Sequence, residues 1–272
     1  MEALSFLVLP FLGCVVLVLI HAYFGVHILE RGIIFVDIAL AQFIGVGIAL
    51  SFLVVHDNNY LFSIIFAVIG ASILSLSKKI DKIVNIEAFI GVLYIFSFAA
   101  SILILDRTPH GLEDFKTILN GNILWLTPNE VISAFVLYAV IGIFHYVFRR
   151  RFFALSYEGQ YNYRWEFLFF LSFALVLVKS VQMAGILQVF AFLIVPALIG
   201  RLYTRKPWGI LIIGWITGLS ASVAGIGFSY IFDLPTAPLT VASLSLLFLV
   251  LLVVKSIRQT GVTARSGIKE QE

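Results

Sequence analysis

Long apolar runs alternate with short polar stretches along this chain. Each run is close to one bilayer in length, because about 20 helical residues cross the ~30 Å hydrocarbon core of a membrane. The runs cover residues 3–24, 33–55, 61–77, 87–105, 129–148, 165–181, 185–204, 209–232 and 238–256. This pattern predicts an all-α polytopic membrane protein in which about nine transmembrane helices form one bundle.

Two of the runs, 165–181 and 185–204, are joined by almost no loop. They form either one kinked span or two spans that meet in a tight turn. The flanking charges decide between these, because Lys and Arg gather on the cytoplasmic side of membrane proteins. Cations stand on both sides of the pair, at Arg149, Arg150, Arg151, Arg164, Arg201, Arg205 and Lys206. We therefore predict two spans that turn near Gly185.

The polar stretches alternate in charge along the chain. Every second stretch collects most of the 18 Lys and Arg residues, whereas the others hold acids such as Asp106, Glu113, Asp114 and Asp233. The positive-inside rule then places the amino terminus outside the cell and the carboxyl terminus inside. The net charge of +3 therefore reflects orientation in the membrane, and no nucleic-acid partner is predicted.

The composition agrees with a membrane protein, with 61% apolar residues, 12% charged residues and a mean hydropathy of +1.06. Residues 1–257 are predicted to form a single transmembrane domain. Residues 258–272 are predicted to be a short, disordered cytoplasmic tail. The single cysteine, Cys14, excludes an internal disulfide and any metal site built from several cysteines.

A few polar residues inside the predicted spans are candidates for a transport pathway. Asp37 lies about one turn inside the second span, where a carboxylate is costly and a pathway role is the default hypothesis. Pairing with Arg31 is the alternative. Gln188 lies about one turn beyond Gly185 and either lines the pathway or hydrogen-bonds a neighbouring helix. Pro196, in the middle of a span, frees a backbone carbonyl and can act as a hinge.

Two loops are long enough to have a function of their own. The inner loop, 149–164, begins with three arginines and either binds lipid headgroups or docks a cytoplasmic subunit. The outer loop, 106–128, contains a predicted short helix that either packs over the bundle or docks an outside partner. Its apolar face consists of Leu112, Phe115, Ile118 and Leu119.

Four segments point to one family of transport proteins. Residues 184–197 read Ala-Gly-Ile-Leu-Gln-Val-Phe-Ala-Phe-Leu-Ile-Val-Pro-Ala, and residues 233–238 read Asp-Leu-Pro-Thr-Ala-Pro. Shorter matching pieces lie at 120–128 and 87–91. In this order the segments resemble the permease subunits of ATP-binding-cassette importers for zinc, manganese and iron, which are distantly similar to the permeases for cobalamin and iron chelates.

The resemblance implies a permease subunit with no catalytic site and no cofactor, in the cell membrane of a prokaryote. Its implied partners are a cytoplasmic ATP-binding subunit, an extracytoplasmic solute-binding protein, a second copy of the chain in a homodimer, and membrane lipid. Together with the polar residues described above, the candidate residues are Asp37, Gln42 and Gln188 in the pathway, with Asp37 as a transient metal ligand; Gly185, Pro196, Asp233 and Pro235 in a gate or hinge; and Arg149, Arg150, Arg151, Glu158 and Gly159 in ATPase docking.

The chain differs from the family in two places. The family's second span carries Gly-Asp-x-Leu-Ser-His, whereas residues 37–42 read Asp-Ile-Ala-Leu-Ala-Gln. The oxygen of Gln42 suits a hard cation such as manganese better than zinc. The family's inner coupling segment is shortened here to residues 156–159.

Other functions remain as alternatives at this stage. The chain could be a permease for a metal chelate. It could also be a stand-alone channel or secondary transporter, although such proteins usually carry several intramembrane charges or paired broken helices. The sequence contains no motif of an intramembrane enzyme.

Overall fold

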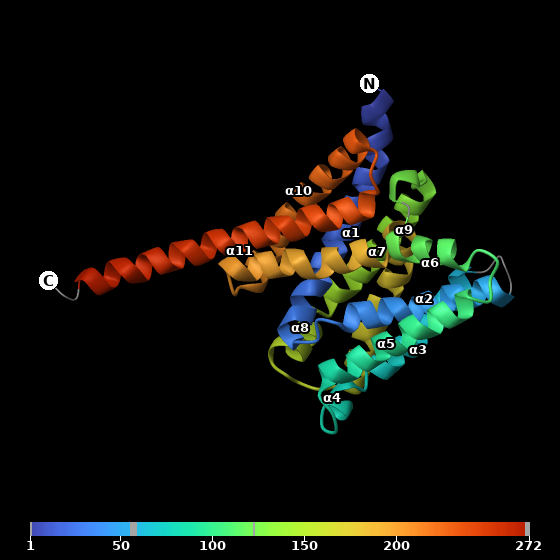
Figure 1. Cartoon of the computed structure of the whole chain (residues 1–272). Coiled ribbons are helices and arrows are strands. Elements are labelled where there is room, and N and C mark those ends of the chain that lie inside the picture. The colour runs from blue at the N-terminus through green and yellow to red at the C-terminus, as the bar shows by residue number, and fades with distance from the viewer. Residues whose placement is uncertain (1, 55–58, 122, 270–272) are drawn as a thin grey trace.

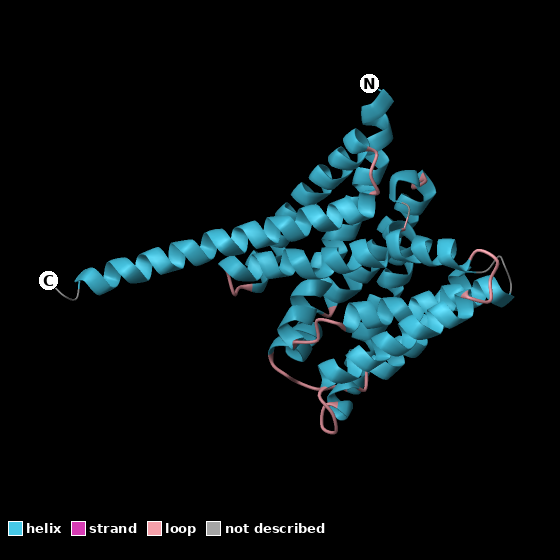
Figure 2. Ribbon diagram, in the orientation of Figure 1, coloured by secondary structure: helices cyan, strands magenta, loops and turns pink. Residues whose placement is uncertain are grey.

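The computed structural model describes residues 2–54, 59–121 and 123–269. Every regular element in these three ranges is a helix, and they contain no strand (Figures 1 and 2). The predicted all-α class is therefore confirmed.

Eight helices contain the predicted apolar runs. They are α1 (Glu2–Arg31), α2 (Val36–Val54), α3 (Asn59–Leu74), α5 (Ile86–Leu105), α7 (Pro128–Val147), α9 (Tyr163–Tyr203), α10 (Pro207–Phe232) and α11 (Thr236–Lys269). Shorter helices lie in the connections between them: α4 (Ser77–Ile80), α6 (Gly111–Asn120), the 3-10 turn η1 (Ile123–Trp125) and α8 (Arg149–Tyr157).

Within the described residues, 7 helices are long and apolar enough to cross a membrane, in place of the nine spans expected. Two differences account for the lower number. The apolar part of α3, Tyr60–Leu74, is shorter than a full span. The runs 165–181 and 185–204 lie in one 41-residue helix, α9, which is interrupted by non-helical dihedral angles at Gly185 (φ 74°, ψ 167°). The predicted break is thus present, but without an intervening loop.

Helix starts follow local sequence signals. Before α7, Thr127 and Glu130 form a capping box: the Thr127 hydroxyl accepts from the Glu130 amide, and the Glu130 carboxylate accepts from the Thr127 amide at 2.7 Å. Pro128 then occupies the first helical position, where its missing N–H costs nothing. Asn162 caps α9 in a similar way. These caps satisfy amides that the first helical turn leaves free.

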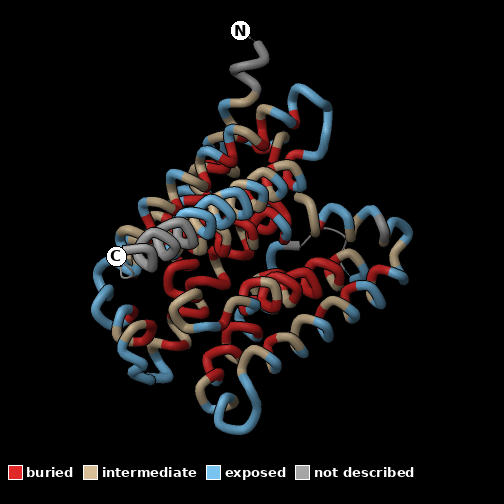
Figure 3. Tube along the Cα trace, turned by 60° about the vertical axis from the view of Figure 1, so that its left-hand side comes forward, coloured by how far each residue is buried: buried red, intermediate tan, exposed pale blue. Residues whose placement is uncertain are grey.

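Helix α9 is the centre of the bundle, and α1, α2, α3, α10 and α11 all pack against it. In its most apolar segment 78% of the residues are buried, compared with 17% in α11. Buried residues are accordingly concentrated in the middle of the molecule (Figure 3). The outer helices α5, α7 and α11 expose apolar side chains, as expected of surfaces that face lipid.

The connections that are rich in cations gather on one face of the molecule. The end of α1, helix α8 and the start of α10 line one hollow, and α4 with the start of α5 and the end of α8 line another. The amino group of Lys255, on α11, lies 5.8 Å from the ring centroid of Tyr203, at the end of α9. The outer loop and the turn between α10 and α11 line a separate hollow. This grouping agrees with the alternation of charge along the sequence.

Two further predictions about connections have different outcomes. The short outer helix is present as α6, whose Phe115, Ile118 and Leu119 pack against the core. The disordered tail is not what the structure shows, because α11 remains helical through Lys269 and projects away from the other helices (Figure 1). Residues 270–272 lie outside the described part of the chain.

Candidate functional site

Asp37 is an isolated acid inside the bundle. It lies in the first turn of α2 and is fully buried. Neither carboxylate oxygen has a hydrogen-bond partner among the described residues. Pairing with Arg31, the alternative considered above, is wrong because Arg31 pairs with Glu166 instead. Since an unpartnered buried polar group is costly, Asp37 is a strong candidate for a functional role.

The two glutamines predicted to line the pathway are also buried. Gln42 is 3% exposed and Gln188 is 0% exposed. The amide nitrogen of Gln188 donates to the sulfur of Cys14 at 3.6 Å, which links α9 to α1, while its side-chain oxygen has no partner in the described structure. Gln188 therefore makes an interhelical contact and keeps a free acceptor. A single protomer exposes none of the three predicted pathway residues on its surface.

The part of the chain that the structure describes contains no preformed metal centre. No group of three or more His, Cys, Asp or Glu side chains in the described residues could hold a metal ion. A cation that passed Asp37 would therefore meet one carboxylate and neutral oxygen ligands. Such ligands bind hard cations weakly, which suits transit rather than storage.

Two of the residues predicted to form a gate, Gly185 and Pro235, lie near one short segment of the outer loop. The backbone of Gly121 is in direct contact with that of Gly185, at the break in α9. Residues 120, 121, 123–125 and 235–238, which include Pro235, together line a hollow of about 240 Å³. Asp233 ends α10 in the left-handed conformation (φ 50°, ψ 47°). The outer loop thus bridges the two predicted gate regions.

Pro196 does not break its helix. Helix α9 continues through it, and the only non-helical residue inside α9 is Gly185. Pro196 is buried and packs closely against Gly214 of α10. Of the two predicted hinge residues in α9, the structure therefore places the change of direction at Gly185 alone.

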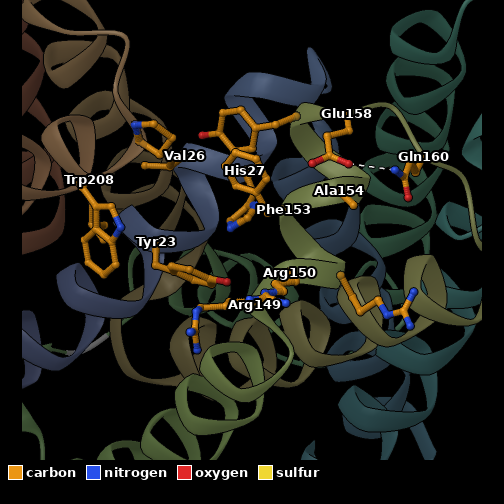
Figure 4. Close-up of a pocket in the computed structure, with 14 residues that line it drawn as sticks. Tyr23, Val26, His27, Arg149, Arg150, Phe153, Ala154, Glu158, Gln160 and Trp208 are labelled. Carbon is orange, nitrogen blue, oxygen red and sulfur yellow. Dashed lines mark hydrogen bonds between the residues drawn. The ribbon is translucent and has the colours of Figure 1, made fainter.

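The predicted docking segment forms helix α8, which has two different faces. Arg149, Arg150 and Arg151 are exposed, whereas a second face buries Phe152, Leu155 and Ser156. The exposed arginines and Glu158 line a hollow of about 760 Å³ together with α1 and the start of α10 (Figure 4). A basic helix that is anchored on its inner side is suited to contact a cytoplasmic partner.

The end of this segment is also held in place. The carboxylate of Glu158 accepts from the Gln160 side chain at 2.8 Å (Figure 4). The carbonyl of Gly159 accepts from the Lys78 amino group at 2.9 Å. Tyr157 lines the hollow, and burial raises the pKa of its hydroxyl to about 12, with a smaller contribution from Glu30. Tyr157 therefore remains a neutral hydrogen-bonding group at physiological pH.

A buried polar cluster beneath α8 was missed by the sequence analysis. The guanidinium of Arg31 donates to the Glu166 carboxylate at 3.0 Å and to the Ser156 hydroxyl at 3.1 Å. The same hydroxyl lies 2.9 Å from Nδ1 of His27. No spacing along the sequence signals these contacts, because the partners are more than a hundred residues apart. A glutamate in the first turn of an apolar helix was the one available hint.

A second polar chain lies beside the first. The hydroxyl of Tyr23 is 3.0 Å from Nδ1 of His145, and the other ring nitrogen of His145 is 2.7 Å from the Ser172 hydroxyl. The ring of His145 stacks on Phe152 of α8, with centroids 4.0 Å apart. In the structure these contacts connect α1, α7, α8 and α9.

Comparisons with known proteins agree with the family resemblance found in the sequence, and they cover most of the chain. Residues 3–255 match the ABC 3 transport family. The manganese transport system membrane protein MntC of Listeria monocytogenes is 25% identical over 256 residues, which cover 90% of this chain and 89% of that protein. The manganese import system permease protein ScaB of Streptococcus parasanguinis is 26% identical and covers 83% of this chain and 82% of its own.

Two solved structures share the fold. PsaBC from Streptococcus pneumoniae, in complex with Fab, superposes with a TM-score of 0.74 at 23% identity over 90% of each chain. An inward-facing putative metal-chelate type ABC transporter gives a TM-score of 0.71 at 16% identity, over 90% of this chain and 85% of that one. The bacterial relatives and the apolar helices identify a multi-pass protein of a prokaryotic plasma membrane. The match over residues 3–255 shows that the chain belongs to the ABC 3 transport family.

Proposed function

We propose that this chain is the membrane-spanning subunit of an ATP-driven importer for a divalent metal ion, with manganese as the first candidate. The subunit receives the ion from an extracytoplasmic solute-binding protein and passes it to the cytoplasm. ATP is hydrolysed on a separate subunit. The family match over residues 3–255 carries this proposal, and relatives named as manganese transporters supply the choice of ion.

The anchored helix α8 is the structural feature that best supports an ATP-driven importer. Its exposed arginines lie on the face where the cation-rich connections gather, and its opposite side is buried in the bundle. A stand-alone channel would not require such a helix. We assign Arg149, Arg150, Arg151, Glu158 and Gly159 to the contact with the ATP-binding subunit.

The proposed number of membrane crossings depends on treating the break in α9 as a turn between two spans. With α3 as a short span and α9 as two spans meeting at Gly185, the chain crosses the membrane nine times. The amino terminus is then outside and the carboxyl terminus inside. We further propose that two copies form a homodimer that encloses a central pathway.

The ion enters this pathway near the outer turn that contains Asp233 and Pro235. It then moves along α2, with transient oxygen contacts from Asp37 and Gln42, and passes Gln188 of α9. Gly185 and Pro196 provide the gate or hinge. Asp37 is the single ionisable ligand assigned to the pathway, which agrees with the lack of a metal-binding cluster in the described residues.

The test combines assembly with uptake. The chain is expressed with a candidate ATP-binding subunit from the same genome, purified through a tag on the chain, and assayed for copurification of that subunit. Uptake of ⁵⁴Mn²⁺ is then measured in cells that lack their own manganese importer. Arg150→Glu should abolish copurification and uptake. Arg205→Glu, which reverses another exposed cation outside the hollow, is the matched control and should retain both.

Two outcomes would contradict the proposal. Uptake without any ATP-binding subunit would indicate a stand-alone channel or secondary transporter. Copurification of the ATP-binding subunit with uptake of a metal chelate, and not of free Mn²⁺, would indicate the chelate-importer function.

A further inference from the structure

We infer that Arg31, Ser156 and Glu166 are positioning residues that transmit movement of α8 to α1 and α9 during transport. This inference rests on the proposed function, because it assumes that an ATP-binding subunit acts on α8. It assigns a role to a buried cluster that lies neither in the pathway nor on the docking surface.

Arg31 joins three helices through one side chain. It is the last residue of α1, and its Nε donates to Ser156 of α8 while its Nη1 donates to Glu166 of α9. The side chains of Arg31 and Glu166 are only 8% and 1% exposed. The guanidinium also lies 4.4 Å from the ring centroid of Phe169, again on α9. A guanidinium presents its donors in a fixed planar fork, so its two partners are held in a defined relative position.

Ser156 shares its hydroxyl between two partners on α1. Its Oγ accepts from Arg31 and lies 2.9 Å from Nδ1 of His27, one helical turn earlier. A hydroxyl has one donor and two acceptor positions, which is enough for both contacts. Ser156 is buried near the end of α8. The charged side of α8 faces solvent, whereas the Ser156 hydroxyl on its inner side contacts two residues of α1.

The rest of the inner face of α8 is apolar. Phe152 stacks on His145 of α7 and lies edge-on to Trp165 of α9, with centroids 5.7 Å apart. Apolar contacts are non-directional and permit sliding, whereas hydrogen bonds lose strength when their geometry changes. The Arg31 fork is therefore the contact that resists displacement of α8 along α9. Glu166 belongs to the same helix as Gly185 and Gln188, so a displacement of the start of α9 acts on the helix that contains the predicted gate.

The experiment measures the coupling of ATP hydrolysis to transport. The full complex is reconstituted in liposomes, and the number of ATP molecules hydrolysed per Mn²⁺ taken up is determined. Arg31→Lys keeps a positive charge beside Glu166 but removes the fork. Ser156→Ala removes the shared hydroxyl and keeps the ion pair. Each variant should copurify with the ATP-binding subunit and raise the ATP-to-Mn²⁺ ratio by roughly fivefold, the lower end of typical coupling between two sites.

A matched control separates positioning from stability. Ser180 is buried like Ser156, and its hydroxyl lies 2.6 Å from that of Tyr138 on α7 and donates to the Val176 carbonyl of α9, so neither of these partners lies on α8. Ser180→Ala should lower the melting temperature about as much as Ser156→Ala and leave the ratio unchanged. Ser156→Thr keeps a hydroxyl at this position and should therefore show the parental ATP-to-Mn²⁺ ratio. The double variant Arg31→Lys/Ser156→Ala should be no worse than either single variant, since both break the same bond.

The inference is overturned if the ratio stays at the parental value in both single variants. It is also overturned if Ser180→Ala raises the ratio equally, because general loosening of the bundle would then be the cause. Failure of the proposed function is distinguishable from both results. In that case the parent complex itself would show no copurification or no uptake before any variant was made.

Discussion

Gly121 and Gly185 lie with their backbones in direct contact, although one belongs to the outer loop and the other to α9. Both have a positive φ, 60° and 74° respectively. A Cβ atom on either glycine would overlap the backbone of the other segment. The break in the central helix is therefore braced by the outer loop, and side chains are excluded from both sides of the contact.

Alanine at either glycine should destabilise the protein. At Gly185 the backbone adopts a combination of φ and ψ that is almost restricted to glycine, at a strain of about 1–3 kcal/mol for other residues, and the added methyl group also clashes. We expect a lower melting temperature in detergent and reduced uptake for Gly121→Ala and Gly185→Ala. Gly142→Ala in α7 is the control, because a Cβ there meets no atom within 4 Å. An equal effect at Gly142 would disprove the role of the contact.

Neutralising Asp37 should nearly stop metal uptake. Asp37→Asn keeps the shape of the side chain but removes the carboxylate assigned to the pathway, so uptake should fall while the amount of protein in the membrane stays the same. Asp106→Asn, at an exposed position, is the control. ⁵⁴Mn²⁺ accumulation is measured at matched permease levels. If Asp37→Asn transports like the parent, this acid is structural and the cargo is better sought among chelates.

Changing the amide at Gln42 should alter uptake less than changing the acid. Gln42→Ala removes one neutral oxygen ligand and should slow Mn²⁺ uptake. Gln42→His introduces a ring nitrogen, a ligand that zinc prefers, and should shift the preference from Mn²⁺ toward Zn²⁺. Competition between the two ions in the same uptake assay measures this shift. An unchanged ion preference in Gln42→His would argue against contact between residue 42 and the ion.

Breaking the buried ion pair between Arg31 and Glu166 should lower the free energy of unfolding far more than breaking the partly exposed pair between Glu30 and Arg201. Glu166→Leu leaves the Arg31 guanidinium buried without its counter-charge, which typically costs about 3–5 kcal/mol. The double variant Arg31→Met/Glu166→Leu should recover much of this loss, because no buried charge remains. Glu30→Gln removes the partly exposed pair with Arg201, and such pairs contribute about 0–1 kcal/mol. Melting temperatures of the purified protein rank the three variants.

Single cysteines should report the proposed orientation. In a Cys14→Ser background, an impermeant thiol reagent applied to intact cells should label cysteines placed at Glu113 and Asp233, but not those at Lys79, Gln160 and Lys206. Glu113, Asp233, Gln160, Lys79 and Lys206 are all exposed, so accessibility within the fold does not limit the reaction. Permeabilised cells provide the control, in which every position reacts. Inverted labelling would reverse the assigned sidedness.

The sequence predicted those features that depend on local pattern. Each apolar run lies in a helix, the outer amphipathic segment is a helix, and the chain changes direction at Gly185. The flanking charges predicted two spans that meet in a tight turn, and the structure has one 41-residue helix with a single non-helical residue at Gly185. Periodicity cannot reveal such a break, because one glycine alters the direction of a helix without altering its apolar pattern.

The contacts of the polar residues were beyond the reach of sequence patterns. Asp37 and Arg31 are close in sequence, which made them plausible partners, yet the guanidinium turns to Glu166. Likewise, His27 and His145 have no ligand spacing along the chain and are nevertheless hydrogen-bonded in the core. These pairings are set by how α1, α7, α8 and α9 pack against one another. The sequence of a single chain contains no direct record of that packing.

Arg31 and Glu166 are separated by 135 positions in the chain. Because the protein is synthesised from its amino end, Arg31 leaves the ribosome well before its partner exists. In the proposed orientation it is, during that interval, an unpaired cation at the cytoplasmic end of the first span, where the positive-inside rule retains it. When the later helix is inserted, the charge becomes buried and paired. The proposed orientation therefore gives the same arginine two successive roles, first as a signal for membrane insertion and afterwards as part of the finished interior.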